Sequence, residues 1–343
     1  MMGSFGDPGA IELQYESGLK KIGWEVHRLE IAENFAARIQ QSVLTKIINR
    51  LSPNLLTREI NKEAVTATQT LRPDVVLIFK GMALHPDTLT DIRKHTRLLV
   101  NYNPDHPLRI YSPGGTNQNV VKGVSRYDVF ISYAKAITQK IKHLNGPVAY
   151  TVPFGYINNL VQEPTGVTND TGTSAFAFVG SWDRGREETF DQLNRTDVSI
   201  YGGGAWLQAK RGSLVHQLYQ KKGLYNGELI QCFQQATGIL NFMRPQNMDE
   251  ASHNMRTFEV PGVGGLLLSP YTQEQADYFE PDKEAVYFTT LSELREKMDF
   301  LSKHPQEVAS IKQAARRRSI NSRYSYDDRA VEIADIIEHT MKQ

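Results

Sequence analysis

The chain has 343 residues, of which 40% are hydrophobic and 22% are charged. This length suits two domains of ordinary size, and the composition is typical of a soluble globular protein. With 39 basic and 38 acidic residues, the net charge is +1. That balance excludes the strongly basic surface of a general nucleic-acid-binding protein, although it leaves a local basic cleft open.

The single cysteine, Cys232, excludes a disulfide within the chain and a zinc site built on several thiolates. Because this usage fits a reducing compartment, we expect a cytoplasmic location. The first eight residues lack the basic and apolar regions of a signal peptide. The longest apolar runs, such as residues 75–79, have the length of a strand and not of a membrane span, which leaves peripheral membrane contact open.

Helix-like and strand-like segments alternate through the first half of the chain. The strand-like segments are nearly continuous apolar runs, which indicates a parallel sheet with helices on both faces. We predict helices at 11–21 and 135–143, and strands at 24–29, 74–79, 97–102, 127–132 and 148–152. A domain of this kind usually begins with a strand, but only two residues precede Gly3, so either the first strand is trimmed or missing, or the start of the sequence is placed too late.

Residues 158–174 are polar and rich in Gly, Pro and Thr, as linkers are. The alternation then restarts, with strands at 175–180, 198–202, 238–242 and 266–269, helices at 187–193 and 228–235, and a helical tail at 291–342. We therefore predict an α/β fold of two doubly wound domains. The N-terminal domain is expected at 1–157 and the C-terminal domain at 175–325, and a final helix at 326–343 could pack back on the N-terminal domain.

The stretch from Asn254 to Leu268 predicts a short helix that carries Glu259, a glycine pair at 264–265 and an apolar strand. Helix N-termini attract phosphate through unpaired N–H groups and the macrodipole. A carboxylate one turn further on can accept hydrogen bonds from two ribose hydroxyls. Glu259 could instead pair with Arg256, which lies three residues earlier on the same helix.

A second candidate is the loop that follows the strand at 175–180. Gly180 and Ser181 would let a phosphate approach the backbone, and Arg184 or Arg186 could bind its oxygens at the carboxyl edge of a parallel sheet. The alternative is a surface loop whose arginines pair with nearby carboxylates. The glycine triplet at 202–204 leaves room for a ligand or for a neighbouring loop.

A third candidate follows the strand at 97–102. Asp105 and His106 lie between two prolines, and an Asp beside a His could act as a general base or bind an acceptor hydroxyl. A simple proline-framed turn capped by Asp105 is the alternative. Lys80 at the end of the strand at 74–79 is a weaker candidate for a phosphate contact, and residues 3–7 could line the same cleft.

The sequence predicts no metal site, because its nine histidines are scattered and no Asp-x-Asp pair is placed to hold a cation on a diphosphate. A serine nucleophile elbow and a lysine-containing phosphate loop are also missing.

Together these features resemble a GT-B glycosyltransferase, in which two Rossmann-like domains face an interdomain cleft. The resemblance is greatest to the CgeB-type, group 1 C-terminal region. It covers roughly residue 176 to the end and is most specific over 254–326, through Met255-Arg256-Thr257-Phe258-Glu259, the glycine pair and Arg323-Tyr324-Ser325-Tyr326. The first half is similar more loosely, through residues 103–107.

The resemblance implies a glycosyltransferase of the hexosyltransferase type that uses a UDP- or GDP-linked sugar and no other cofactor or metal. Glu259 matches the family glutamate that binds the nucleotide ribose, and Arg184 matches a phosphate-binding basic residue. Backbone N–H groups of His253, Asn254 and Met255 would face the diphosphate, with Arg256 supporting the site. The acceptor, whether glycan, protein, lipid or small molecule, is not implied.

One departure from the family pattern concerns the stereochemistry. Many related retaining enzymes carry a second glutamate eight positions before the ribose-binding one, but Ala251 stands there and Glu250 is off register. An inverting enzyme would need a general base such as Asp105, whereas a retaining one would rely on the diphosphate.

Three alternatives to a glycosyltransferase of ordinary acceptors remain. The chain could be a non-catalytic nucleotide-sugar-binding protein, for which the missing glutamate is the best support. It could be a sugar-nucleotide epimerase of the same architecture. It could also glycosylate modified DNA bases, against which the near-neutral charge argues.

Overall fold

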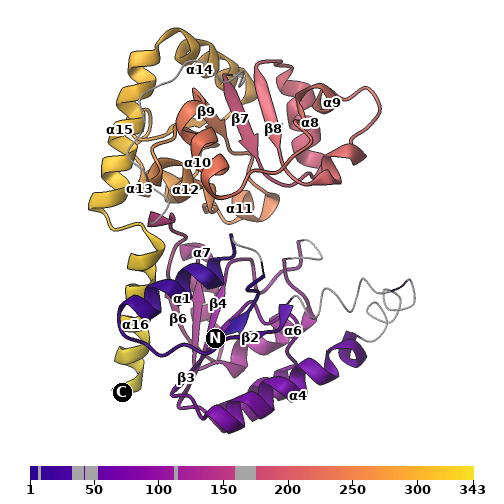
Figure 1. Ribbon diagram of the computed structural model, residues 1–343, viewed down its shortest axis with the longest axis vertical. Helices are drawn as coiled ribbons and strands as arrows, with labels where there is room; N and C mark the ends of the chain where they lie inside the picture. The colour runs from indigo at the N-terminus through magenta and orange to yellow at the C-terminus, as the bar shows by residue number, and fades with distance from the viewer. Residues whose placement is uncertain (7–8, 33–41, 43–52, 112–114, 159–174) are drawn as a thin grey trace. The chain divides into compact units, whose positions relative to one another are not determined.

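The computed structural model describes residues 1–6, 9–32, 42, 53–111, 115–158 and 175–343 (Figure 1). The chain divides into two compact units. Unit 1 comprises Met1–Phe154 and Asp327–Gln343, and unit 2 comprises Gly155–Tyr326. Apart from residue 158, the predicted linker at 158–174 lies outside the described residues.

Unit 1 contains a six-stranded sheet in the order β2-β1-β3-β4-β5-β6, in which all neighbours pair in parallel. The strands are β1 (Met2–Gly3), β2 (Leu29–Glu30), β3 (Val75–Phe79), β4 (Leu98–Asn103), β5 (Val129–Ser132) and β6 (Val148–Thr151). The first strand is therefore present, although it has only two residues. The strand predicted at 24–29 is wrong in position, because the chain joins the sheet only at Leu29, where it pairs with β1.

The helices of unit 1 are α1 (Ile11–Lys21), α4 (Pro53–Leu71), α5 (Pro86–Arg93), α6 (Gln118–Gly123), α7 (Lys135–Lys142) and, apart from its first residue, α16 (Tyr326–Met341). Helix α16 is tied to the rest of the unit at its beginning. Lys21 Nζ lies 2.7 Å from Asp327 Oδ2, and Arg329 Nε donates to the carbonyl of Phe154 at 3.2 Å.

Unit 2 contains a five-stranded parallel sheet in the order β11-β10-β9-β7-β8. Its strands are β7 (Phe176–Val179), β8 (Val198–Tyr201), β9 (Gly238–Leu240), β10 (Leu267–Pro270) and β11 (Val286–Phe288). Its helices are α8 (Arg184–Leu193), α9 (Val215–Leu218), α10 (Asn226–Gln235), α11 (Pro245–Asp249), α12 (Arg256–Gly262), α13 (Gln273–Tyr278), α14 (Leu291–Lys303) and α15 (Pro305–Asn321).

The core of unit 2 lies between its sheet and helices and is rich in aromatic rings. Phe178 from β7 contacts Phe190 from α8 and the fully buried Trp206, with ring centroids 5.4 and 5.8 Å apart. Such pairs fix the sheet against its helices. The predicted continuous tail at 291–342 is three helices, because Pro305 begins a new helix after His304 and a second break at residues 322–325 precedes α16.

No helix in the described ranges is long and apolar enough to cross a membrane.

Candidate functional site

The strand order of unit 2 places a topological switch point between β7 and β9. The chain runs from β7 outward to β8 on one side, and then returns to β9, β10 and β11 on the other. In open parallel sheets, ligands bind at the carboxyl ends of the strands at such a point. A ligand-binding site of unit 2 is therefore expected among the residues that follow β7 and β9.

Arg186 connects the two loops at this switch point. Its Nη1 donates to the carbonyl of Ser181 at 2.8 Å, and its Nε and Nη2 donate to the carbonyl of Phe242 at 3.1 and 3.0 Å. Its guanidinium also lies over the ring of Phe178. Sequence reasoning assigned Arg186 to phosphate, but in the structure its donors hold the backbone ends of β7 and β9 together.

Two further arginines lie close to Arg186. Burial lowers the pKa of Arg186 to about 10, Asp183 opposes this effect, and the positive charges of Arg244 and Arg256 act in the same direction as burial. We call Arg186, Arg244 and Arg256 the guanidinium cluster. Like charges that are brought together in a partly buried place favour binding of an anion.

Arg244 is the member of the cluster that the sequence reading missed. It follows β9, is half-buried and precedes Pro245 at the start of α11. Within the described parts of the chain, its side chain has neither an ion pair nor a hydrogen bond. The rule that singled out Arg184 and Arg186, a basic residue directly after a strand, would also have found Arg244.

Arg256 and Glu259 form an ion pair on α12. Arg256 also donates from Nε and Nη2 to the carbonyl of Val179, the last residue of β7, at 3.3 and 3.2 Å. The alternative pairing that the spacing suggested is thus present, and it holds Glu259 at the switch point. The Glu259 side chain is 13% exposed and the Arg256 side chain 23%, so both remain accessible to a ligand.

The other candidate residues near the end of β7 differ in their exposure and in their contacts. Arg184 begins α8, is half-exposed and donates from Nε to Glu188 Oε1 at 2.9 Å. Gly180 is half-buried, and a Cβ on Gly202 would come within 2.2 Å of its carbonyl oxygen. The first glycine of the 202–204 triplet therefore lets a neighbouring loop approach, which was one of its two predicted roles.

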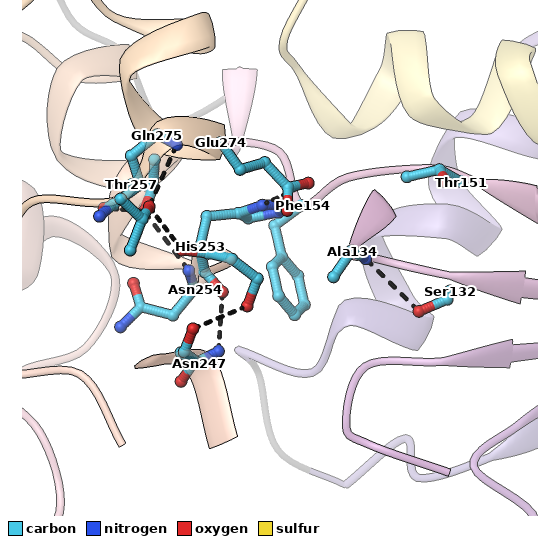
Figure 2. Close-up of polar contacts among 12 residues, drawn as sticks. Ser132, Ala134, Thr151, Phe154, Asn247, His253, Asn254, Thr257, Glu274 and Gln275 are labelled. Atoms are coloured by element: carbon cyan, nitrogen blue, oxygen red, sulfur yellow. Dashed lines mark hydrogen bonds and ion pairs between the residues drawn. The ribbon is translucent and has the colours of Figure 1, made fainter. Parts of the chain in front are cut away.

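A buried polar network lies beneath the start of α12. Asn241, after β9, exchanges hydrogen bonds with Asn254 at 3.2 and 2.8 Å and donates to Ser269 Oγ at 3.1 Å. Figure 2 shows Thr257 between Asn254 and Gln275; the Thr257 hydroxyl donates to Gln275 Oε1 at 2.9 Å. These bonds fix the loop ends of β9 and β10 against α12.

His253 has its side chain fully buried between the rings of Phe258 and Tyr278. Its Nδ1 lies 3.3 Å from Glu274 Oε1 (Figure 2). Its carbonyl accepts a hydrogen bond from Asn247 at 2.8 Å. The imidazole therefore anchors the loop from inside, which is compatible with the predicted role of its backbone.

The backbone at the start of α12 has two N–H groups that remain available. The N–H of Asn254 donates weakly to Thr257 Oγ1 at 3.4 Å, whereas the N–H groups of Met255 and Arg256 make no hydrogen bond among the described residues. Gly264, with φ of +87°, then ends the helix in the left-handed region as predicted.

The candidate residues of the first half lie in unit 1. Asp105 Oδ2 lies 2.7 Å from Lys80 Nζ. His106 is buried, and its Nδ1 accepts hydrogen bonds from the N–H groups of Leu108 and Arg109 at 3.2 and 3.1 Å. His106 therefore fixes the loop after β4 through these hydrogen bonds, and Asp105 is the residue of this loop whose carboxylate could contact a ligand.

In the portion of the chain that the structure describes, no group of three or more His, Cys, Asp or Glu residues is placed to hold a metal ion.

Two Rossmann-like parallel sheets define the fold of the GT-B glycosyltransferases. The fold of this chain is similar to that of several solved structures. Sucrose-phosphate synthase from Thermosynechococcus elongatus is similar with a TM-score of 0.68 and 10% identity, over 98% of this chain and 97% of that one. Anabaena HepE, in complex with UDP-glucose, has a TM-score of 0.62 and 12% identity over 98% of each chain. A putative UDP-N-acetylglucosamine 2-epimerase from Listeria monocytogenes has a TM-score of 0.58 and 14% identity, over 97% and 94%.

Residues 184–335 match the model of the glycosyl transferase-like family. The predicted resemblance to glycosyl transferases is therefore confirmed for residues 184–335, and the predicted GT-B fold is confirmed by the solved structures, while the CgeB-type branch stays a prediction. No curated protein sequence matches the chain.

Proposed function

We propose that the protein is a glycosyltransferase that moves a sugar from a nucleotide-diphosphate donor to an acceptor hydroxyl without a metal ion. The observation that carries this proposal is the guanidinium cluster at the switch point of the second sheet. The positive charges of Arg244 and Arg256 both act on Arg186, and Arg244 has no carboxylate partner in the described chain. A diphosphate would neutralise this charge.

In this proposal the donor lies along the carboxyl ends of β7 and β9. Arg244 and Arg256, with the N–H groups of Met255 and Arg256, bind the diphosphate, and Glu259 accepts hydrogen bonds from the ribose hydroxyls. Arg184 would join them only by exchanging its bond to Glu188. The UDP-glucose bound by HepE supports a uridine donor.

The arginines would supply the electrostatic part of catalysis. As the bond between the anomeric carbon and the diphosphate oxygen breaks, its electron pair moves to the diphosphate, and positive groups already in place stabilise that charge. The acceptor oxygen forms the new bond to the anomeric carbon and transfers its proton to a base. We propose the Asp105 carboxylate as this base, and His106 holds its loop.

Donor affinity measured by calorimetry tests the proposal, with UDP-glucose as ligand and EDTA present. We expect Glu259→Ala and Arg184→Ala to weaken binding, by about 10-fold or more where a charge-assisted hydrogen bond is lost. Glu188→Ala is the matched control, because it frees Arg184 and should not weaken binding. Unchanged affinity in both variants would overturn the assignment.

An epimerase is the second candidate, which the Listeria neighbour supports. Incubation with UDP-N-acetylglucosamine alone distinguishes an epimerase from a glycosyltransferase, because an epimerase inverts one stereocentre of the sugar without an acceptor. A second sugar nucleotide in the NMR spectrum would favour the epimerase, whereas donor binding without turnover in any assay would favour the non-catalytic protein.

A further inference from the structure

The first sheet has a switch point of its own, between β1 and β3. The chain passes from β1 to β2 on one side and returns to β3, β4, β5 and β6 on the other. By the rule applied to unit 2, a ligand of unit 1 should bind where Gly3-Ser4 follows β1 and Lys80 follows β3. The donor proposal leaves this place unused.

Glu12 of α1 lies against the end of β1. Its Oε1 accepts a hydrogen bond from the N–H of Ser4 at 3.2 Å, and a Cβ on Gly3 would come within 2.7 Å of its Cγ. Glycine at position 3 thus allows the close approach of this carboxylate. Burial raises the pKa of Glu12, the neighbouring charge of Glu30 acts in the same direction, and its backbone hydrogen bonds and Lys80 oppose the rise.

Lys80 lies between two carboxylates. Its backbone has φ of +58°, a left-handed conformation that is uncommon for a residue other than glycine. Its ammonium group interacts electrostatically with Glu12 and lies 2.7 Å from Asp105 Oδ2. The result is a row of carboxylate, ammonium and carboxylate across the switch point.

A buried amide next to this row points to a ligand. Asn103, the last residue of β4, is fully buried, and its Oδ1 accepts a hydrogen bond from the N–H of Asp105 at 3.0 Å. Its Nδ2 has no hydrogen-bond partner within the described chain. An unsatisfied buried donor costs about 1–3 kcal/mol, so a ligand oxygen beside Asp105 would relieve a real penalty.

We propose that Glu12, Lys80, Asp105 and Asn103 bind the hydroxyl groups of a sugar, and that the acceptor of the transfer is therefore a glycan or glycoside. The carboxylates accept hydrogen bonds, and Lys80 and Asn103 donate them. This alternation of acceptors and donors matches adjacent sugar hydroxyls, each of which both donates and accepts. Two carboxylates at one place disfavour a phosphorylated acceptor.

The inference rests on the proposed function, because it names the acceptor of that reaction. The test uses the full chain with UDP-glucose and a panel of p-nitrophenyl glycosides and unmodified mono- and disaccharides. Donor affinity is measured separately by calorimetry. The variants are Glu12→Gln and Asp105→Asn, and the control is Glu25→Gln, whose side chain in the same unit is 87% exposed.

We expect transfer to at least one sugar of the panel. Glu12→Gln and Asp105→Asn should raise the acceptor KM by about 10- to 100-fold, the range for loss of a hydrogen bond to a charged group, while donor affinity stays within 2-fold of the wild type. Asp105→Asn should also lower kcat, because Asp105 is the proposed base, whereas Glu12→Gln should leave kcat nearly unchanged. Glu25→Gln should match the wild type. Thermal melting checks that each variant is folded.

Two results would overturn the inference while the proposed function survives: donor binding with transfer to no sugar of the panel, or wild-type acceptor KM in both folded variants. Failure of the wild type to bind a donor would instead refute the proposed function and this inference with it. If Glu12→Gln does not fold, the acceptor KM of Asp105→Asn still decides between the outcomes.

Discussion

Replacement of Arg244 by Gln should change the free and the ligand-bound protein in opposite directions. Without a ligand, the charge of Arg244 repels that of Arg186, and Arg244 has no compensating carboxylate among the described residues. Loss of its charge should therefore leave the melting temperature of unit 2 unchanged or slightly raised. With UDP bound, the same change removes a diphosphate contact and should lower the stabilisation that UDP provides.

The expected size follows from the strength of one charge-assisted hydrogen bond. A loss of about 2 kcal/mol corresponds to about 30-fold weaker UDP binding. At a UDP concentration of about 100 times the wild-type Kd, the wild type gains about 2.7 kcal/mol and the variant only about 0.9 kcal/mol. For a unit of this size, about 2–4 °C accompany each kcal/mol, so UDP should raise the melting temperature by about 5–10 °C in the wild type and about 2–4 °C in the variant.

Differential scanning calorimetry at fixed ionic strength, with and without UDP, measures both effects. Arg317→Gln is the charge-matched control, because Arg317 is exposed on α15 and should give the wild-type response. Equal UDP stabilisation in the wild type and Arg244→Gln would refute the role of Arg244. A large loss of stability in the ligand-free variant would mean that Arg244 has a structural role instead.

Three further predictions concern buried groups of unit 2, two through stability and one through reactivity. Gly262→Ala should lower the free energy of unfolding, measured by urea titration, by about 1–3 kcal/mol, because its Cβ would come within 2.2 Å of Tyr156. The control Gly227→Ala should not lower it, because its Cβ would have no atom within 4 Å. Burial lowers the pKa of Lys312 to about 8, so the folded state binds fewer protons than the unfolded state between that value and 10.5, and stability should rise with pH in this window by about 2–3 kcal/mol. Lys312→Met should abolish that rise, and an equal rise in the variant would refute it. Burial raises the pKa of Cys232 to about 11, so the native thiol should react with iodoacetamide at pH 8 far more slowly than in urea, and equal rates would contradict this.

The sequence predicted those elements whose local pattern is strong. Strands β3, β4 and β5 lie within two residues of their predicted starts, because each is a buried apolar run, and α1 has its predicted bounds. Strand β1 was doubtful because two residues carry no pattern, and its pairing with β2 and β3 depends on tertiary structure. The break at Pro305 was readable, since proline favours the first turn of a helix.

The site was harder to predict, because a sequence does not give strand order. The candidate loops after β7 and β4 follow from the rule that ligands bind at the carboxyl ends of parallel strands. Only the order β9-β7-β8 shows that the loop after β9, with Arg244, belongs to the same place. Likewise, the Lys80 contact with Asp105 joins the ends of β3 and β4, two segments that the sequence analysis treated separately.

The three arginines of the cluster illustrate how structure divides residues of one type between two roles. Arg186 donates hydrogen bonds to the carbonyls of Ser181 and Phe242, so it fixes the backbone that a ligand would contact. Its charge remains there, nevertheless, and it raises the electrostatic cost of Arg244 and Arg256 nearby. The positive groups are thus held in place, at an electrostatic cost, before an anion binds. This arrangement is expected where a developing negative charge must be stabilised without reorganisation. The guanidinium cluster should therefore reduce the stability of the free protein, and the diphosphate should restore it.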